Sequence, residues 1–181
     1  MPNSSFTSNS SSTLRLYYQN VRGINSKIHQ IFPNVCLNNF NIICLTETWL
    51  DASVSSSEIF PLSYSVIRCD RDKQFSNCSR GGGALIAIDS DLKFELLDLH
   101  VPPQLRMIDI VGCKIFLSFT LINILNLYIP PNIAVDDFQM FLEYLEHTVI
   151  NMSNVVIMGD FNIPKFVSMD LNDGKVNLIL R

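Results

Sequence analysis

Charged residues are scarce in this sequence. They make up 17% of the 181 positions, whereas about a quarter is usual in a soluble globular domain. Hydrophobic residues make up 48%, so much of the chain is expected to be interior, and the composition excludes a disordered protein. The net charge of −4 lacks the basic excess typical of nucleic-acid binders, although acidic ligands of a bound cation would also contribute negative charge.

Cysteines are few, and their spacing has no metal-binding pattern. The chain contains Cys36, Cys44, Cys69, Cys78 and Cys113, an odd number without a CxxC motif or a Cys/His spacing typical of zinc sites. Cys36 and Cys44 have apolar neighbours and are expected to be core residues. This usage of cysteine favours a reducing compartment.

The sequence also lacks a recognisable targeting or membrane-spanning segment. The stretch "MPNSSFTSNSSST" has neither the basic start nor the apolar centre of a signal peptide, and its Ser/Asn content predicts a flexible tail at 1–13. The longest apolar stretch, 115–129, is interrupted by polar residues and is too short for a bilayer, so we expect two strands joined by a turn. Repeats and linkers are absent, which favours one domain over 14–181.

Short apolar segments predict a strand-rich fold with two helices. Strands are expected at 14–18, 42–46, 65–68, 84–88, 93–99, 107–116, 121–128 and 155–158. A helix is expected at 26–39, capped by Asn25 or Ser26 and kinked or divided at Pro33. Apolar residues with helical periodicity predict a second helix at 135–151. Two packed sheets with helices outside fit this combination.

Several predicted strands end in polar residues of the kind that catalysis uses. Asn20 follows the first strand and Glu47 the second; Tyr128 ends the strand at 121–128; Asp160 and Asn162 follow the last. Carboxylate and amide oxygens suit Mg²⁺, which needs only one or two carboxylates, so Glu47 would anchor the ion with Asn20 beside it. Asp160 would orient or deprotonate a water, and Tyr128 and Asn162 would hold phosphate oxygens. The pattern predicts a metal-dependent phosphoester hydrolase.

Each of these residues also has a structural interpretation. Glu47 and Asn20 could be exposed turn residues, and Asp160 and Asn162 could be turn formers. Tyr128 could be an ordinary aromatic residue of the sheet.

Trp49 and a cluster of basic residues lie near these positions in the sequence. Trp49 is expected to be a packing residue rather than a platform for stacked bases. Arg68, Arg71, Lys73 and Arg80 crowd one polar stretch, which is either a solvated loop or a contact with a DNA backbone.

Five segments in order resemble the endonuclease/exonuclease/phosphatase family, whose fold is that of deoxyribonuclease I and the apurinic endonucleases. They are "YYQNVRG", "CLTETWL", "GGGALIAI", "LNLYIPP" and "VIMGDFN". More specifically, the segments "QNVRGINSK", "LTETWLD" and "CDRD" resemble the endonuclease domain of jockey-like non-LTR retrotransposons of insects. The resemblance covers roughly 14–164 and implies a four-layer α/β sandwich.

The resemblance also implies roles for the residues already singled out. Asn20 and Glu47 match the metal-site asparagine and glutamate, and Tyr128 matches a tyrosine that contacts the scissile phosphate. Asp160 matches the aspartate that readies the attacking water, and Asn162 an asparagine that orients the phosphate. A Mg²⁺ (or Mn²⁺) cofactor and a double-stranded DNA substrate are implied. A monomer is expected, with a reverse-transcriptase domain in the parent element, nuclear location and no membrane association.

The sequence departs from this family near its C-terminus. The family closes its site with Ser-Asp-His, but the histidines here are His29, His100 and His147, and none follows "GDFN". We therefore expect the domain at 14–181 to be incomplete at its C-terminus and to lack the last strands. A DNA-nicking endonuclease remains the first interpretation. The alternatives are a catalytically inactive fragment of such a domain and a phosphatase of the same superfamily acting on a lipid or small phosphoester.

Overall fold

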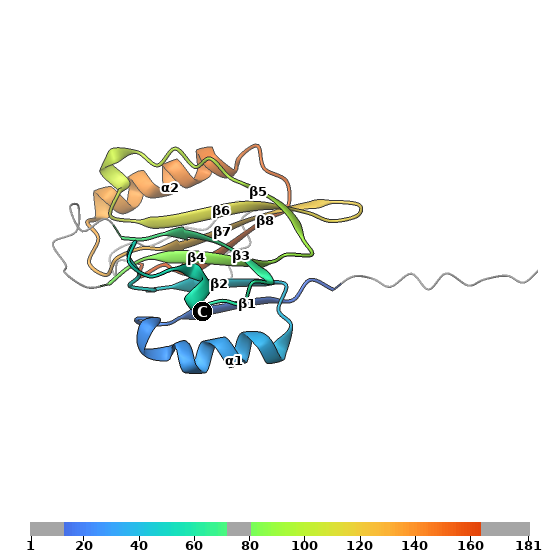
Figure 1. Ribbon diagram of the computed structural model, residues 1–181. Coiled ribbons are helices and arrows are strands. Elements are labelled where there is room, and N and C mark those ends of the chain that lie inside the picture. Colours follow the sequence, from blue (N-terminus) through green and yellow to red (C-terminus); the bar gives the residue numbers. More distant parts are fainter. Residues whose placement is uncertain (1–12, 72–80, 164–181) are drawn as a thin grey trace, which may run out of the picture.

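Two four-stranded sheets pack face to face between two helices in the computed structural model, which describes residues 13–71 and 81–163 (Figure 1). The first sheet has the order β1 (Leu16–Asn20), β2 (Ile42–Thr46), β4 (Ala84–Asp89), β3 (Tyr64–Cys69). The second has the order β5 (Lys93–Leu96), β6 (Asp109–Phe116), β7 (Leu121–Tyr128), β8 (Val155–Asp160). Helix α1 (Ile28–Asn38) covers the first sheet and α2 (Val135–Val149) the second. The predicted four-layer α/β sandwich is confirmed.

Both sheets mix parallel and antiparallel pairs. β1 runs parallel to β2, with Asn20 opposite Thr46, and β7 runs parallel to β8, with Tyr128 opposite Asp160. The other neighbouring pairs are antiparallel. β8 also lies against β1 and β2 of the first sheet. The carboxyl ends of the four parallel-paired strands therefore meet at one edge of the sandwich.

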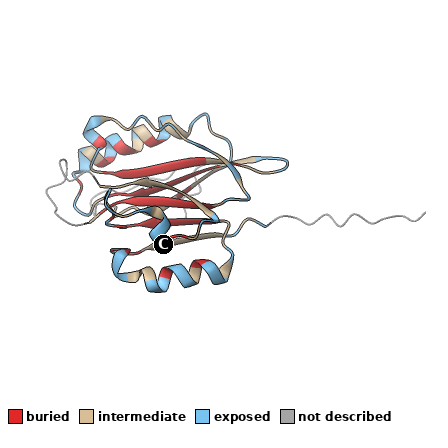
Figure 2. Ribbon diagram, in the orientation of Figure 1, coloured by how far each residue is buried: buried red, intermediate tan, exposed pale blue. Residues whose placement is uncertain are grey.

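The core is apolar on both faces of the central strands. Ile42, Ile86, Ile115 and Ile124 belong to the cluster between the sheets. The opposite face of the first sheet packs on α1, and that of the second on α2 (Figure 2). Every residue of β2 is buried, which is why this strand is an uninterrupted apolar run in the sequence.

One buried polar side chain ties the two sheets together. Asn126 of β7 is fully buried, and its amide nitrogen donates to the carbonyl oxygens of Leu45 (2.9 Å) and Leu85 (2.8 Å). Leu45 and Leu85 are cross-strand partners in the first sheet. A buried N–H group is costly unless it is hydrogen-bonded, and both N–H groups of this amide are bonded to the opposite sheet, so Asn126 helps to fix how one sheet sits on the other.

The first helix differs from the prediction at its start. A short 3-10 helix, η1 (Asn25–Lys27), precedes α1, and neither helix has a side-chain cap, so the cap predicted at Asn25 or Ser26 is wrong. Pro33 lies inside an uninterrupted α1, so it does not divide the helix. Proline removes one backbone hydrogen bond of the helix, and burial of Ile31 and Val35 against the first sheet offsets that loss of stability.

Other predictions shift in detail or fall outside the described residues. Cys36 is exposed rather than a core residue, whereas Cys44 is buried. Two short 3-10 helices, η2 (Ser56–Glu58) and η3 (Pro103–Leu105), lie in segments between strands. Positions 1–12 of the predicted tail, the segment 164–181, and Lys73, Cys78 and Arg80 lie outside the described ranges. Within those ranges, no helix has the length and apolarity that crossing a membrane requires.

Candidate active site

Three of the predicted site residues meet through the side chain of Asn20. Its amide nitrogen donates to Glu47 Oε1 at 3.0 Å and to Asp160 Oδ2 at 2.6 Å. Asn20 ends β1, Glu47 follows β2 directly, and Asp160 ends β8. The structure therefore joins the two sheets at this edge through two carboxylates and one amide.

The loop after β2 turns sharply to present Glu47. Glu47 and Trp49 both have positive φ, +52° and +55°, which is uncommon for residues with side chains. The loop after β1 holds this turn, because the Gly23 N–H donates to the Glu47 carbonyl at 2.8 Å. The Trp49 ring packs directly on Gly23, where an added Cβ would lie 2.6 Å from a ring carbon. Trp49 is thus a packing residue, with 39% of its surface exposed.

Tyr128 lies at the same edge and is 5% exposed. Its hydroxyl makes no hydrogen bond to a described residue. Burial raises the Tyr128 pKa to about 12, and the nearby carboxylates of Glu47 and Asp160 favour the same direction. The hydroxyl therefore stays protonated at neutral pH and is able to donate a hydrogen bond.

The raised pKa of Tyr128 predicts a late alkaline titration. An ordinary tyrosine ionises near pH 10, whereas the Tyr128 pKa is raised to about 12. Between these values the folded chain binds more protons than the unfolded chain, so Tyr128 should make the protein less stable as pH rises through this interval. Tyrosinate absorbance followed against pH should show a late phase that Tyr128→Phe removes. Superimposable titrations of the two proteins would contradict the prediction.

Asn162 lies beside this group without a direct hydrogen bond to it. Its amide nitrogen donates to the Ile129 carbonyl at 2.9 Å, and the Ile129 N–H donates to the Asp160 carbonyl at 2.9 Å. These bonds fix the Asn162 amide next to the end of β8. The second N–H of that amide has no partner among residues 13–71 and 81–163.

Two residues of this edge were not predicted from the sequence as site residues, Arg71 in the suggested DNA-contact loop and Asp109 at the start of β6. The Arg71 guanidinium donates to Asp109 through Nη2 at 2.6 Å and through Nε at 3.0 Å. Its central carbon lies 5.1 Å from the centre of the Tyr128 ring. Burial raises the pKa of Asp109, and the hydrogen bonds from Arg71 oppose that shift. The segment "CDRD" contains Arg71, but the sequence does not show its pairing because Asp109 lies 38 positions away along the chain.

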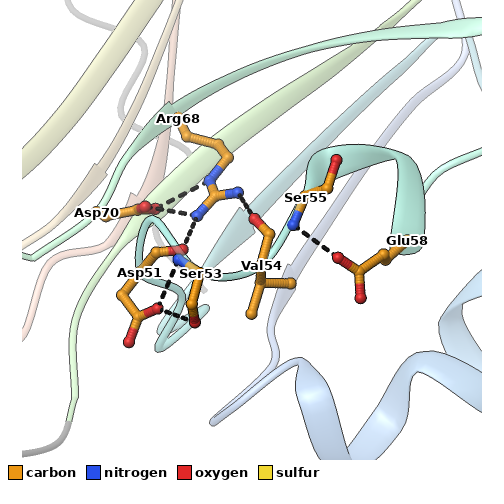
Figure 3. Close-up of polar contacts among 7 residues, drawn as sticks. All are labelled: Asp51, Ser53, Val54, Ser55, Glu58, Arg68 and Asp70. Atoms are coloured by element: carbon orange, nitrogen blue, oxygen red, sulfur yellow. Dashed lines mark hydrogen bonds and ion pairs between the residues drawn. The ribbon is translucent and has the colours of Figure 1, made fainter.

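Arg68 has a structural role (Figure 3). It forms an ion pair with Asp70 at 2.5 Å and donates to the carbonyls of Val54 (2.7 Å) and Asp51 (3.0 Å). These contacts tie the loop after Trp49 to the end of β3. Arg68 is therefore neither a residue of a solvated loop nor a free contact for a DNA backbone; it is a paired residue of β3.

The histidines of the chain lie elsewhere. His29 and His147 are exposed on α1 and α2. His100 is exposed and lies 3.2 Å from Asp98. Within the described residues, none of the three contacts a predicted site residue.

The donor set at this edge fits a hard divalent cation. No group of three or more His, Cys, Asp and Glu suited to a metal occurs in the ranges 13–71 and 81–163, so a cation here would rely on carboxylates together with an amide. The Asn20 nitrogen lies between two carboxylates, where positive charge is favoured. A half-turn of this amide would exchange its nitrogen for oxygen and make the set all-oxygen, as Mg²⁺ prefers.

Comparison with known proteins gives matches at the level of structure. No protein-family model and no curated protein sequence matches the chain. An AP endonuclease from Archaeoglobus fulgidus is 21% identical with a TM-score of 0.56, and the alignment covers 83% of this chain and 58% of that one. The endonuclease domain of TRAS1, a telomere-specific non-LTR retrotransposon, is 16% identical with a TM-score of 0.55, covering 82% and 60%.

A mannosyl-6-phosphatase from Bacteroides thetaiotaomicron is similar to the same degree, 18% identical with a TM-score of 0.57, over 86% of this chain and 68% of that one. The chain thus spans about three fifths of the length of the first two proteins. At these identities the comparisons show the fold, and they agree with the resemblance in the sequence motifs.

Proposed function

From the fold that this chain shares with the endonuclease/exonuclease/phosphatase proteins, we propose that it is a metal-dependent phosphodiester hydrolase that nicks double-stranded DNA. The observation that carries the proposal is the Asn20 amide lying between the Glu47 and Asp160 carboxylates. This group unites residues from opposite sheets at the edge where the parallel strands end. A purely structural role for Glu47 and Asp160 would not require two acids to converge.

Glu47 and Asn20 would hold the cation, Mg²⁺ or Mn²⁺. When bound, such an ion neutralises charge on a phosphate and polarises its oxygens. The chain's own groups would do the rest. Asp160 would orient a water and take its proton, using the carboxylate oxygen that accepts no hydrogen bond from a described residue.

Tyr128 and Asn162 would bind the phosphate. The Tyr128 hydroxyl has no described partner, and because its pKa is raised to about 12 it stays protonated well above neutral pH. The Asn162 amide donates one N–H to the Ile129 carbonyl, and its other N–H, which has no partner in the described part of the chain, would donate to the phosphate. Donors fixed in advance stabilise developing negative charge more than mobile ones.

DNA is the proposed substrate because of the sequence motifs and the TRAS1 neighbour. A nick made by such an endonuclease would expose a 3′ hydroxyl that primes reverse transcription. The parent element would then carry a reverse-transcriptase domain and act in the nucleus. The phosphatase neighbour supports a second candidate, hydrolysis of a small phosphoester, which a panel of such compounds separates from DNA nicking.

The test is conversion of supercoiled plasmid to open circles by the purified chain, with Mg²⁺ and with chelator. Glu47→Gln removes the charge but keeps the size, so we expect nicking to fall by at least about 10–100-fold and to need more metal. Glu146→Gln, on the exposed surface of α2, is the matched control and should nick like the wild type.

Metal binding has a readout besides activity. Trp49 is the only tryptophan of the chain and lies two positions after Glu47, so its fluorescence should respond to Mg²⁺ in the wild type and respond less in Glu47→Gln. Nicking that persists in chelator would refute the proposal. A folded wild-type protein that binds the metal without nicking DNA would favour the inactive fragment or, if it hydrolyses a small phosphoester, the phosphatase.

A further inference from the structure

We propose that the buried ion pair of Arg71 and Asp109, called here the Arg71–Asp109 clamp, is a positioning element of the active site. It holds the loop that carries Glu47 against the sheet that carries Tyr128, and it fixes the ring of Tyr128. The effect on catalysis rests on the proposed function. The structural effect does not, and it has a measurement of its own.

The clamp crosses from one sheet to the other. Asp109 begins β6 of the second sheet and lies opposite Tyr128 in the register of β6 and β7. The same Oδ2 atom accepts the N–H of Gly83 at 2.7 Å, and Gly83 directly precedes β4 of the first sheet. One carboxylate therefore connects the start of a strand in each sheet.

The glycines that contact the clamp also hold the Glu47 loop. The Trp49 N–H donates to the Gly82 carbonyl at 3.0 Å, and the Thr48 N–H lies 3.4 Å from the Gly83 carbonyl. Thr48 and Trp49 immediately follow Glu47. The position of Glu47 is thus linked through Gly82 and Gly83 to Asp109 in the opposite sheet.

Gly82 and Gly83, the last two of the three glycines before β4, make this approach possible. A Cβ at Gly82 would lie 2.3 Å from Nε of Arg71, and a Cβ at Gly83 would lie 2.3 Å from Oγ1 of Thr48. Both glycines have positive φ, +75° and +88°. A side chain at either position would displace the guanidinium or the loop.

The guanidinium end of the clamp fixes Tyr128. Arg71 is 10% exposed and Asp109 is 2% exposed. Two nitrogens of Arg71 are bound to Asp109, and the guanidinium lies over the Tyr128 ring at 5.1 Å. A planar, bidentate ion pair restricts the motion of the guanidinium, so the motion of the Tyr128 ring beneath it is restricted as well.

Stability alone is a weak reason for such a pair. Removing two charges from water offsets most of their attraction, and apolar residues of similar size often serve a core equally well. This pair contacts Tyr128, which in turn lies near the carboxylates of Glu47 and Asp160 and must keep its place relative to them. Its fixed geometry therefore fits a positioning role better than a stabilising one.

The test compares the wild type with Arg71→Met/Asp109→Asn. Methionine keeps apolar contact with the Tyr128 ring, asparagine keeps an acceptor for Gly83, and no unpaired charge is buried. The matched control is Arg68→Met/Asp70→Asn, which removes an ion pair from the same stretch of chain without touching Tyr128. Circular dichroism and thermal unfolding establish that each variant is folded.

The structural readout is ¹⁹F NMR of protein labelled with 3-fluorotyrosine. The chain has five tyrosines, and Tyr128→Phe identifies the resonance of Tyr128. In Arg71→Met/Asp109→Asn we expect the chemical shift of that resonance to change, and the signals of different ring orientations to average into one. In the control variant we expect the resonance to stay unchanged. An unchanged Tyr128 resonance in the folded clamp variant would overturn the proposal, whatever the activity.

The catalytic readout is the nicking rate at saturating and at limiting DNA. Misplacement of reacting groups by about 1 Å lowers rates by about 100-fold, so we expect a loss of that size in kcat with KM changed less than about threefold. Full activity of the clamp variant would overturn the catalytic part of the proposal. A wild type that does not nick DNA would refute the proposed function alone, and the ¹⁹F comparison would still decide the clamp.

Discussion

Gly159→Ala is expected to unfold the protein under conditions in which the wild type is folded. Gly159 lies in β8 with φ of +146°, opposite Leu127 of β7. A Cβ at this position would lie 1.9 Å from the Leu127 carbonyl oxygen and 2.8 Å from its carbonyl carbon. Both are backbone atoms of the neighbouring strand, so the steric clash can be removed only by separating β7 from β8.

The expected loss of stability exceeds about 4 kcal/mol, which is exceptional for one residue and requires a specific steric cause. Urea unfolding followed by far-UV circular dichroism measures it. Gly112→Ala is the matched control, because its shortest contact, at 2.7 Å, is with the end of the Leu125 side chain. A side chain can rotate away, so the control should lose only about 1–3 kcal/mol. Equal unfolding midpoints for Gly159→Ala and the wild type would contradict the steric argument.

Two largely apolar strands, β2 and β7, were predicted from the sequence at their observed bounds. β2 and β7 are observed at Ile42–Thr46 and Leu121–Tyr128, as predicted. In both, most residues are buried, and a polar residue (Glu47) or a proline (Pro130) comes within two positions of the strand's end. Predicted boundaries were less accurate where tertiary packing decides at which residue an element begins or ends. The first helix, for example, begins with a 3-10 segment rather than with a capped turn.

The convergence of strand ends was predictable for a similar reason. Parallel neighbours carry their last residues to the same edge of a sheet, so Asn20 and Glu47 had to lie close, as did Tyr128 and Asp160. The sequence could not show that one amide would join the two pairs across the sandwich. That contact spans 140 positions between Asn20 and Asp160.

The Arg71–Asp109 clamp could not be predicted from the sequence, because neither residue stands in a distinctive local pattern. An arginine within a polar stretch usually points to solvent. Asp109 interrupts an apolar strand, which on its own indicates only an edge or a turn. Their pairing depends on the packing of β4 against β6, and no local pattern encodes a contact between two sheets.

If the chain nicks DNA as proposed, Asp160→Asn is expected to abolish most of that activity while leaving the protein folded. The change keeps the size of the side chain, and its amide oxygen could still accept the hydrogen bond that Asn20 donates at 2.6 Å. It removes the ability to accept a proton from water, and general-base catalysis contributes about 10²–10⁴-fold to rates. We therefore expect a loss of about 1,000-fold, measured in a single turnover with excess enzyme.

Metal binding separates this effect from that of Glu47→Gln. If Glu47 holds the cation and Asp160 handles the proton, Asp160→Asn should keep the Trp49 fluorescence response to Mg²⁺ that Glu47→Gln weakens. Asp98→Asn, at an exposed position, controls for the loss of one negative charge and should nick like the wild type. Nicking by Asp160→Asn within about tenfold of the wild type would place the base elsewhere, because that loss is smaller than a general base contributes. Asp160 would then be a second ligand of the cation or a partner that only orients Asn20.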